Sequence, residues 1–226
     1  MKAMILAAGR GERMRPLTDT CPKPLLTVRG KALIVWHIEA LIAAGVTELV
    51  INHAHLGQQI ESRLGNGSQF GARIHYSPEI NALETAGGIA TALPLLGDAP
   101  FLVVNGDVFC PGFNFSLASQ QAAVMNQSDL LAWLWLVHNP DHHPNGDFAL
   151  HAERVLSEGT PQYTFSGIGL YHPALFAHTP ARQAAKLAPL LRSAMQQEQI
   201  GGTLYEGEWT DVGTPQRLRA LNEMDD

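Results

Sequence analysis

The sequence predicts an α/β fold, a doubly wound and mostly parallel mixed sheet joined to a smaller β-rich part. Through the first half of the chain, apolar runs of strand length alternate with segments of helical periodicity. Such alternation implies right-handed crossover connections between parallel strands. After residue 107, strand-like runs follow one another with few helices between them. We therefore expect one domain over residues 1–226, with an α/β half at 1–107 and a mixed half at 108–226.

The first half opens with an apolar run that ends just before Gly9 and is typical of a buried strand. Apolar residues at helical spacing then lead up to Gly45, which stands where a helix C-cap is expected, and Gly65 closes the next helix in the same way. The expected order is a strand at 3–7, a helix at 33–44, a strand at 48–53, a helix at 57–64, a strand at 72–77, a helix at 85–96 and a strand at 100–105.

The second half is predicted to be rich in strands until its last forty or so residues, which are helical in pattern. Thr214 and Pro215 are a typical N-cap and first-turn pair for the final helix. The expected order is strands at 130–137, 148–151, 154–157 and 162–171, then helices at 186–197 and 215–223.

The charge balance narrows the classes of partner. A formal net charge of −6 disfavours binding to nucleic acid or to an anionic membrane surface. The basic residues are unevenly placed, however, and this leaves open a local positive pocket for a small anion. Those within the first 31 positions are Lys2, Arg10, Arg13, Arg15, Lys23, Arg29 and Lys31.

The cysteines and the hydropathy pattern bear on the compartment. Cys21 and Cys110 are the only cysteines, too few for a disulfide framework or a four-cysteine zinc site. The apolar run at the N-terminus is too short for the core of a signal peptide, and no apolar run is long enough to span a bilayer. We expect a cytoplasmic protein, either a monomer or a small homo-oligomer.

The strongest motif is a glycine-rich basic loop that follows the first strand. Open α/β sheets bind ligands at the carboxyl ends of their strands, where this loop begins. Gly9 and Gly11 allow backbone N–H groups to approach phosphate oxygens closely. Arg13 in the loop, and Lys23 in the Pro-Lys-Pro segment that follows, can neutralise phosphate charge.

Two common nucleotide-binding motifs fit this part of the chain less well. A dinucleotide-binding fingerprint requires a third glycine where the chain has Met14, and Gly30-Lys31 lacks the upstream glycine of a Walker A sequence. A tight turn with solvated arginines would account for the glycines alone. It would not account for the strand end and the downstream Pro-Lys-Pro together.

Two distant aspartates are candidate metal ligands. Asp107 follows Asn105 and Gly106 at the end of a buried strand, and Asp211 stands just before the last helix. Mg²⁺ is commonly bound by one or two carboxylates together with substrate phosphates. The alternatives are a plain Asn-Gly-Asp turn at Asp107 and a helix-entry residue at Asp211.

Further candidate segments carry weaker signals. Small residues open the helix expected at 85–96, where a flat base could lie against the backbone, although a capped helix with a packed glycine accounts for them equally well. Gly146-Asp147-Phe148 and the 165–168 segment place polar groups at loop or strand ends that could bind hydroxyls. The ten histidines, including the adjacent pair His142 and His143, show no standard zinc spacing.

Taken together, these segments resemble the sugar-1-phosphate nucleotidyltransferases, over essentially the whole chain. Within that family, the segments at 51–57, 95–101, 142–148 and 164–167 are similar to the N-acetylmuramate-1-phosphate uridylyltransferases. The shared motifs are Leu6-Ala7-Ala8-Gly9-Arg10-Gly11-Glu12-Arg13 with Pro22-Lys23-Pro24, Asn105-Gly106-Asp107, and Trp209-Thr210-Asp211-Val212-Gly213-Thr214.

The resemblance implies a Rossmann-like nucleotidyltransferase fold of the GT-A kind and an enzyme of peptidoglycan recycling. Its substrates would be UTP and N-acetylmuramate α-1-phosphate, and its products UDP-N-acetylmuramate and pyrophosphate. Arg13, Lys23 and Asp107 would be catalytic, and Asp107 and Asp211 would hold Mg²⁺. The nucleotide would be bound by Ala7, Ala8, Gly9, Gly11, Glu12, Arg13, Lys23, Thr85 and Gly87, and the sugar phosphate by Asn105, Asp147, Thr164 and Gly167.

Three alternatives to this function stay open at the level of the sequence. The chain could activate another sugar, as a glucose-1-phosphate thymidylyl- or uridylyltransferase or a mannose-1-phosphate guanylyltransferase does. It could be a non-catalytic sensor of nucleotide sugars, although such a protein is expected to have lost one of Arg13, Lys23, Asp107 or Asp211. It could be a glycosyltransferase of similar fold, although the sequence has no Asp-x-Asp triplet.

Overall fold

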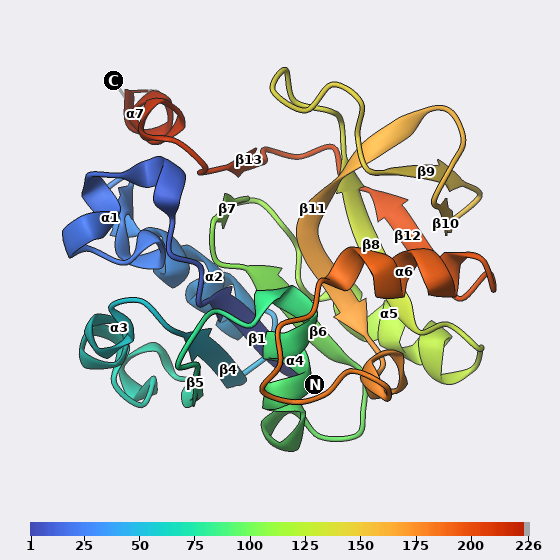
Figure 1. Cartoon of the computed structure of the whole chain (residues 1–226), viewed down its shortest axis with the longest axis horizontal. Helices are drawn as coiled ribbons and strands as arrows, with labels where there is room; N and C mark the ends of the chain where they lie inside the picture. The colour runs from blue at the N-terminus through green and yellow to red at the C-terminus, as the bar shows by residue number, and fades with distance from the viewer. Residues whose placement is uncertain (224–226) are drawn as a thin grey trace.

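The computed structural model describes residues 1–223, and its main feature is one nine-stranded sheet that runs through both halves of the chain (Figure 1). In spatial order its strands are β5 (Arg73–Pro78), β4 (Glu48–His53), β1 (Lys2–Ala7), β6 (Phe101–Asn105), β11 (Gln162–Tyr171), β8 (Ala132–Val137), β12 (Ile200–Leu204), β10 (Arg154–Leu156) and β9 (Phe148–His151). Two short ribbons accompany it, β2 (Thr27–Val28) with β3 (Lys31–Ala32), and β7 (Val108–Phe109) with β13 (Thr210–Asp211).

The sheet has a parallel part and a part in which parallel and antiparallel pairs are mixed. The four strands β5, β4, β1 and β6 are parallel, as expected for crossover connections through helices. Strand β11 then runs antiparallel to both β6 and β8, and β12 is parallel to β8. The predicted α/β class is confirmed, with the parallel pairing concentrated in the first half and a mixed arrangement beyond it.

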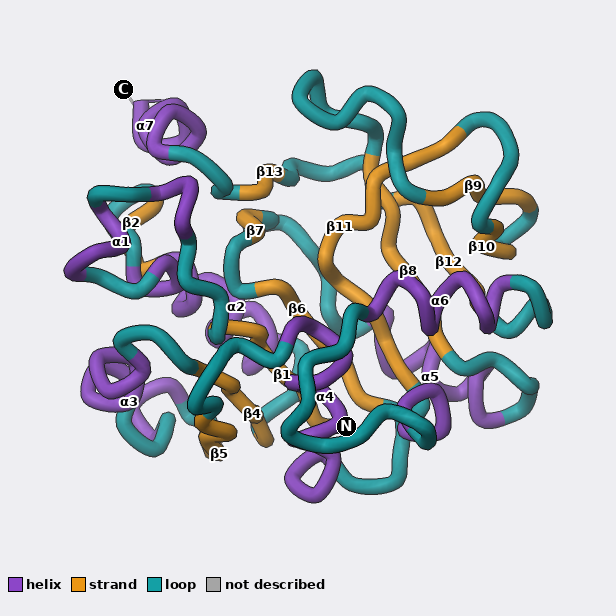
Figure 2. The backbone as a smooth tube through the Cα atoms, in the orientation of Figure 1, coloured by secondary structure: helices purple, strands orange, loops and turns teal. Residues whose placement is uncertain are grey.

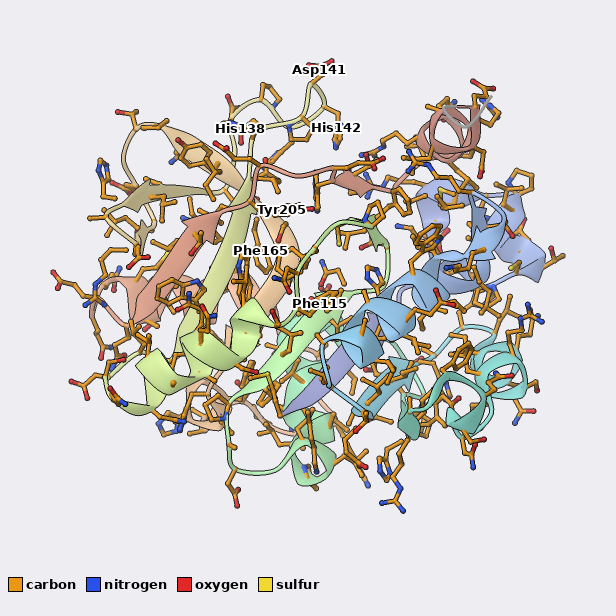
Figure 3. All side chains as sticks on the ribbon, turned by 180° about the vertical axis from the view of Figure 1, so that it is seen from behind. Phe115, His138, Asp141, His142, Phe165 and Tyr205 are labelled. Carbon is orange, nitrogen blue, oxygen red and sulfur yellow. The ribbon has the colours of Figure 1, made fainter. Side chains whose placement is uncertain are left out.

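Helices cover both faces of this sheet, so it has two separate apolar cores. On one face, α2 (Leu33–Ala43), α3 (Gly57–Leu64) and α5 (Leu117–Asn126) pack against side chains such as Ile5. On the other face, α4 (Glu84–Leu96) and α6 (Leu187–Met195) pack against side chains such as Met4. Neighbouring residues of a strand point to opposite faces, so the all-apolar strands serve both cores. Figure 3 shows the α2 and α5 side, behind the view of Figure 1.

A third, smaller core joins the two ends of the chain. The C-terminal helix α7 (Pro215–Glu223) packs against β2, and Leu218 and Leu221 share a cluster with Met14, Phe109 and Val212. Figure 1 shows α7 beside the short helix α1 (Leu17–Thr20). This packing brings the late ribbon strand β13 next to the region that follows β1. Short 3₁₀ helices occur at Glu12–Met14, Lys23–Leu25, Ser68–Phe70 and Pro173–Phe176.

Apart from the short helix α1, the two-residue strands β2, β3, β7 and β13 and the 3₁₀ turns, two elements were not predicted, α5 and β12. Helix α5 buries only Ala118 and Met125 and has no charged residue, so its helical periodicity is faint. Strand β12 contains Gly201, where a Cβ would lie 2.4 Å from the Trp133 ring; the strand needs this glycine to pass the ring, but glycine is atypical of strands. All the helices and strands that were predicted are present, with ends that agree to within about two residues.

The boundary predicted at residue 107 does not interrupt the sheet, because β11 of the second half pairs with β6 of the first. Within residues 1–223, no helix combines the length and apolar character needed to cross a membrane.

Candidate functional site

A cavity of about 460 Å³ lies at the carboxyl ends of the parallel strands, where open α/β sheets usually bind ligands. The loops that follow β1, β5 and β6 enclose it. Its lining residues are Leu6, Ala7, Ala8, Gly9, Gly11, Glu12, Arg13, Lys23, Pro24, Asn52, Glu79, Ala82, Leu83, Glu84, Thr85, Asn105, Gly106, Asp107 and Gly213.

The glycine-rich loop forms one wall of this cavity. Gly11 adopts a left-handed conformation, with φ of +69°, and a Cβ there would lie 2.9 Å from the Thr18 methyl carbon. The Thr18 hydroxyl and the Met14 N–H both donate to the Gly11 carbonyl, at 2.9 and 2.8 Å. These bonds turn the loop tightly into the 3₁₀ helix that carries Arg13, whose exposed side chain lines the cavity. Glu12 is also exposed and pairs with Arg10 at 2.7 Å.

Lys23 and Asp107 meet inside the cavity although 84 residues separate them in the chain. The Lys23 ammonium lies 2.7 Å from Asp107 Oδ2, and the Lys23 side chain is only 9% exposed. Gly106 holds Asp107 close to β1, because its N–H donates to the Leu6 carbonyl at 2.9 Å and a Cβ there would lie 2.5 Å from the same oxygen. The structure thus joins two of the three predicted catalytic residues in one ion pair.

The predicted metal ligand Asp211 lies on β13, and the other, Asp107, lies directly before β7, the strand that pairs with β13. Thr210 and Asp211 of β13 face Phe109 and Val108 of β7, and the Val212 N–H donates to the Asp107 carbonyl at 2.7 Å. The side chain of Asp211 accepts from Arg217 and lies 2.8 Å from His142 Nε2.

This pair of aspartates fits a hard cation that takes most of its ligands from elsewhere. Within residues 1–223 no cluster of three or more His, Cys, Asp or Glu residues could enclose a metal alone. Asp107 lines the cavity, and Asp211 lies two residues before Gly213 of the lining. Carboxylates placed at the edge of a cavity in this way suit Mg²⁺, which typically binds through one or two carboxylates, water and substrate phosphates.

A buried histidine contacts β7, the strand that pairs with the Asp211 strand β13. His37 of α2 lies with its Nε2 2.9 Å from the Val108 carbonyl. Complete burial lowers the pKa of His37 to about 4, opposed in part by that hydrogen bond and by the nearby Asp107 charge. The imidazole is therefore neutral at ordinary pH and donates to the carbonyl that follows Asp107.

A buried polar network at the opposite wall was not predicted. Asn52, at the end of β4, accepts from the Ala7 N–H at 2.9 Å and donates to Glu79 Oε1 at 2.7 Å. The other Glu79 oxygen accepts from the Leu83 N–H at 2.8 Å. These bonds tie β1 and β4 to the loop that enters α4. The available signal was a polar residue at the end of an otherwise apolar strand run.

At the start of α4, the first residues line the cavity and the next turn packs against another segment of the protein. Thr85 lines the cavity, as does Glu84, whose φ of +58° marks a sharp turn into the helix. Gly87, predicted to bind nucleotide, is not among the lining residues and packs against the segment before α6. Its N–H donates to the Ala185 carbonyl at 3.2 Å, and a Cβ there would lie 2.1 Å from the Gln183 carbonyl oxygen. Gly87 is therefore a packed helix glycine, which allows this close approach of two segments.

The predicted sugar-binding residues form a second group beside the cavity. Asn105 lines the cavity, and Gly167 sits directly against it, because a Cβ on Gly167 would lie 2.7 Å from the Asn105 amide nitrogen. Asp147 accepts from the Phe165 N–H at 2.8 Å, and the Thr164 hydroxyl donates to Asn139 at 2.9 Å. Asp147, Thr164 and Gly167 thus shape the wall of the second half without lining the cavity itself.

Comparison with known proteins places this geometry in a family. The family model described as nucleotidyl transferase matches residues 2–226. The chain belongs to the nucleotidyl transferase family. It is 56% identical to the N-acetylmuramate alpha-1-phosphate uridylyltransferase of Neisseria meningitidis serogroup B, an alignment that covers 99% of this chain and 98% of that protein. It is 34% identical to the protein of the same name from Caulobacter vibrioides, over 95% of this chain and 92% of that one.

The fold of this nucleotidyl transferase is also found in a solved structure. A putative glucose-1-phosphate thymidylyltransferase from Bacillus anthracis, in complex with a sucrose, superposes with a TM-score of 0.86 over 99% of this chain and 94% of that chain. At 24% sequence identity this likeness supports the fold. The resemblance inferred from the motifs is confirmed, and the chain is an enzyme of the nucleotidyl transferase family.

Proposed function

We propose that this nucleotidyl transferase moves a uridylyl group from UTP to N-acetylmuramate α-1-phosphate, giving UDP-N-acetylmuramate and pyrophosphate. The observation that carries the proposal is the Lys23–Asp107 pair, set against a basic glycine-rich loop in one cavity. The choice of substrates is supported by the high identity to the uridylyltransferase from N. meningitidis.

The reaction does not require a protein side chain to remove a proton from the nucleophile. An oxygen of the sugar phosphate is already anionic at neutral pH, so it can attack the α-phosphorus of UTP without a protein base. The difficulty is to hold two polyanions in line and to stabilise the charge that develops on the leaving pyrophosphate. A cluster of cations and N–H groups within an acidic protein meets that need.

Each residue of the first wall then has a definite role. Backbone N–H groups of the loop from Gly9 to Arg13 would bind the triphosphate, and the Arg13 guanidinium would stabilise the leaving pyrophosphate. Lys23 would lie between the α-phosphate and the sugar phosphate. Because the Lys23 side chain is held nearly out of water, its charge acts on these groups with little screening.

Asp107 and Asp211 would hold Mg²⁺, which would polarise phosphate oxygens when it is bound. In the structure each carboxylate is paired with a cationic side chain, Lys23 for Asp107 and Arg217 for Asp211. Both aspartates are thus oriented by the chain itself.

The rest of the cavity would position the two organic groups. The uracil would lie along the backbone at Ala7, Ala8 and Thr85, with the Asn52–Glu79 network supporting that surface. Asn105 would contact the sugar, while Asp147, Thr164 and Gly167 would shape its wall. We place the reaction in the cytoplasm, as a step in the recycling of peptidoglycan, consistent with unpaired cysteines at positions 21 and 110.

Substrate choice is tested by measuring pyrophosphate release, with Mg²⁺ present, over a matrix of nucleoside triphosphates and sugar 1-phosphates. The matrix includes UTP, dTTP and GTP against the 1-phosphates of N-acetylmuramate, N-acetylglucosamine, glucose and mannose. Selective turnover of UTP with N-acetylmuramate α-1-phosphate is expected. Turnover of another pair would keep the mechanism and replace the substrate. Nucleotide binding without any turnover would indicate a sensor instead.

A further inference from the structure

The loop between β8 and β9, residues 138–147, reaches over β13 (Figure 2) and brings a second side chain to Asp211. His142 Nε2 lies 2.8 Å from Asp211 Oδ1, and Arg217 of α7 donates from Nη1 to the same oxygen. Figure 3 shows Asp141 at the outer tip of this loop, with His142 next to it. A loop of the second half and the C-terminal helix thus converge on one carboxylate oxygen.

The hydrogen bonds among these three groups depend on the tautomer of His142. His142 Nε2 and Arg217 Nη1 are 2.6 Å apart. A guanidinium nitrogen can only donate, so Nε2 must accept from Arg217 or donate to Asp211 and cannot do both. When Nε2 donates, two donor side chains share one carboxylate oxygen. A second anionic acceptor beside Asp211 would give each of them a partner of its own.

This group of side chains borders both the cavity and the proposed sugar wall. Gly213 lines the cavity, and a Cβ on it would lie 2.5 Å from Arg217 Nη2. At its other end the 138–147 loop reaches Asp147, which binds the backbone of β11 through the Phe165 N–H. Arg217 therefore lies against the cavity lining at Gly213, and His142, which contacts Arg217, lies on the loop that also carries Asp147 of the proposed sugar wall.

The proposed substrate carries an anion that suits this position. N-acetylmuramate differs from N-acetylglucosamine by a lactyl ether that ends in a carboxylate. A guanidinium binds a carboxylate through charge-assisted hydrogen bonds, and an imidazole N–H can add a third. We propose that His142 and Arg217 form the subsite for the lactyl carboxylate and thereby select muramyl over glucosaminyl substrates. This inference rests on the proposed function.

The anomeric phosphate is the other anion that these donors could bind. It is common to both sugars, whereas the lactyl carboxylate is present only in the muramyl sugar. The ratio of kcat/KM for N-acetylmuramate α-1-phosphate to kcat/KM for N-acetylglucosamine 1-phosphate therefore separates the two roles. It also cancels any effect of Arg217 on Asp211, which serves both substrates.

The ratio is measured for the wild type, His142→Ala and Arg217→Gln. The matched control is His138→Ala, since His138 lies on the same loop with its side chain 68% exposed. We expect the ratio to fall about tenfold or more in the first two variants, as loss of a hydrogen bond to a charged group predicts, and to stay unchanged in the control. The dissociation constants of UDP-N-acetylmuramate and UDP-N-acetylglucosamine, measured by calorimetry, are expected to shift in the same direction.

A wrong subsite and a wrong substrate would give different results in this experiment. If the wild type prefers the muramyl sugar and both variants keep that preference, the subsite assignment is wrong while the proposed function stands. Equal losses with both sugars would assign His142 and Arg217 to the phosphate or to Asp211, and would also overturn the subsite. If the wild type does not use the muramyl sugar at all, the proposed function fails first. Thermal unfolding of each variant checks that it folds.

Discussion

Lys23 shows how one side chain can be both buried and ready to bind an anion. Burial of an ammonium group is costly unless a hydrogen-bonding partner of opposite charge comes with it. Asp107 supplies that partner at 2.7 Å, and its own side chain stays 38% exposed toward the cavity. The ion pair therefore holds the Lys23 ammonium at a position where phosphate groups can join it.

Replacement of Lys23 by methionine should damage catalysis much more than folding. Methionine keeps the buried apolar stem, and the remaining Asp107 carboxylate can be hydrated from the cavity, so we expect the free energy of unfolding to change by about 1 kcal/mol or less. Loss of the charge at the transferred phosphate should lower kcat by about 100-fold or more. Steady-state kinetics and urea unfolding measure the two quantities.

The control for this variant is Lys31→Met, because Lys31 pairs with Glu39 on the exposed surface away from the cavity. Its kcat should match the wild type. A Lys23→Met protein that is destabilised yet keeps normal kcat when folded would show that Lys23 is a structural residue only.

At the scale of elements, the site depends on where strands end and where one strand is irregular. Asn52 and Asp107 are placed by the ends of β4 and β6. Strand β11 has a register shift against β8 between Phe165 and Ile168, and Gly167 there has φ of +81°. Such bulges redirect side chains next to functional sites. Here the bulge brings β11 against Asn105.

Substitution of Gly167 by alanine tests that contact. The left-handed backbone alone should cost about 1 kcal/mol, and a Cβ that would lie 2.7 Å from the Asn105 amide nitrogen should displace that side chain as well. We expect a raised KM for the sugar phosphate with little change in KM for UTP. Gly45→Ala is the matched control, because Gly45 also has a positive φ, +79°, but has open space around its Cβ position. Equal kinetic effects of the two variants would contradict a role for the bulge.

Some of these elements and site residues were predicted from the sequence, and others were not. The segments that became β4 and β11 were predicted with their observed bounds, β4 from the apolar run at its centre and β11 from the aromatic and aliphatic residues along it. Lys23 and Asp107 were recognisable because each lies in a short motif. The Asn52–Glu79 network and the contact of His142 with Arg217 were not, because their partners are 27 and 75 residues apart and meet only in the folded chain.

For the molecule as a whole, the nine-stranded sheet is the frame that carries the site, and both halves of the chain contribute residues to it. The basic loop and Lys23 come from the first half, while Asp211, Asp147 and the β11 bulge come from the second. Helix α7 returns to the N-terminal region and packs against β2, so the end of the chain helps to place Asp211 beside Asp107. Both halves must therefore fold together for the site to form.

The stability of this frame should decline in mild acid because of His37. An unfolded histidine takes up a proton near pH 6.5, whereas burial lowers the pKa of His37 to about 4 in the folded protein. The unfolded state thus binds more protons between these values, and stability is present above pH 6.5 and lost as the pH falls toward 4. At pH 5 this one group should lower the free energy of unfolding by about 2 kcal/mol relative to pH 7.

Urea unfolding of the wild type and of His37→Gln at pH 7 and pH 5 measures this contribution. Glutamine can still donate to the Val108 carbonyl but does not titrate. Groups common to both proteins cancel, so the loss on acidification should be smaller in the variant. An identical loss in both proteins would show that His37 is not the responsible group.

The decisive experiment on the cavity is pyrophosphate release from UTP and N-acetylmuramate α-1-phosphate by the wild type and by Asp107→Asn, each titrated with Mg²⁺. Asparagine keeps the size of the side chain and removes its charge. We expect metal-dependent turnover in the wild type and a loss of about 100-fold or more in the variant. The variant should unfold at a lower temperature, because the buried Lys23 loses its charged partner, but with a cooperative transition that shows a folded protein. Near-normal Mg²⁺-dependent turnover by a folded Asp107→Asn protein would contradict the assignment of this cavity as the centre of nucleotidyl transfer.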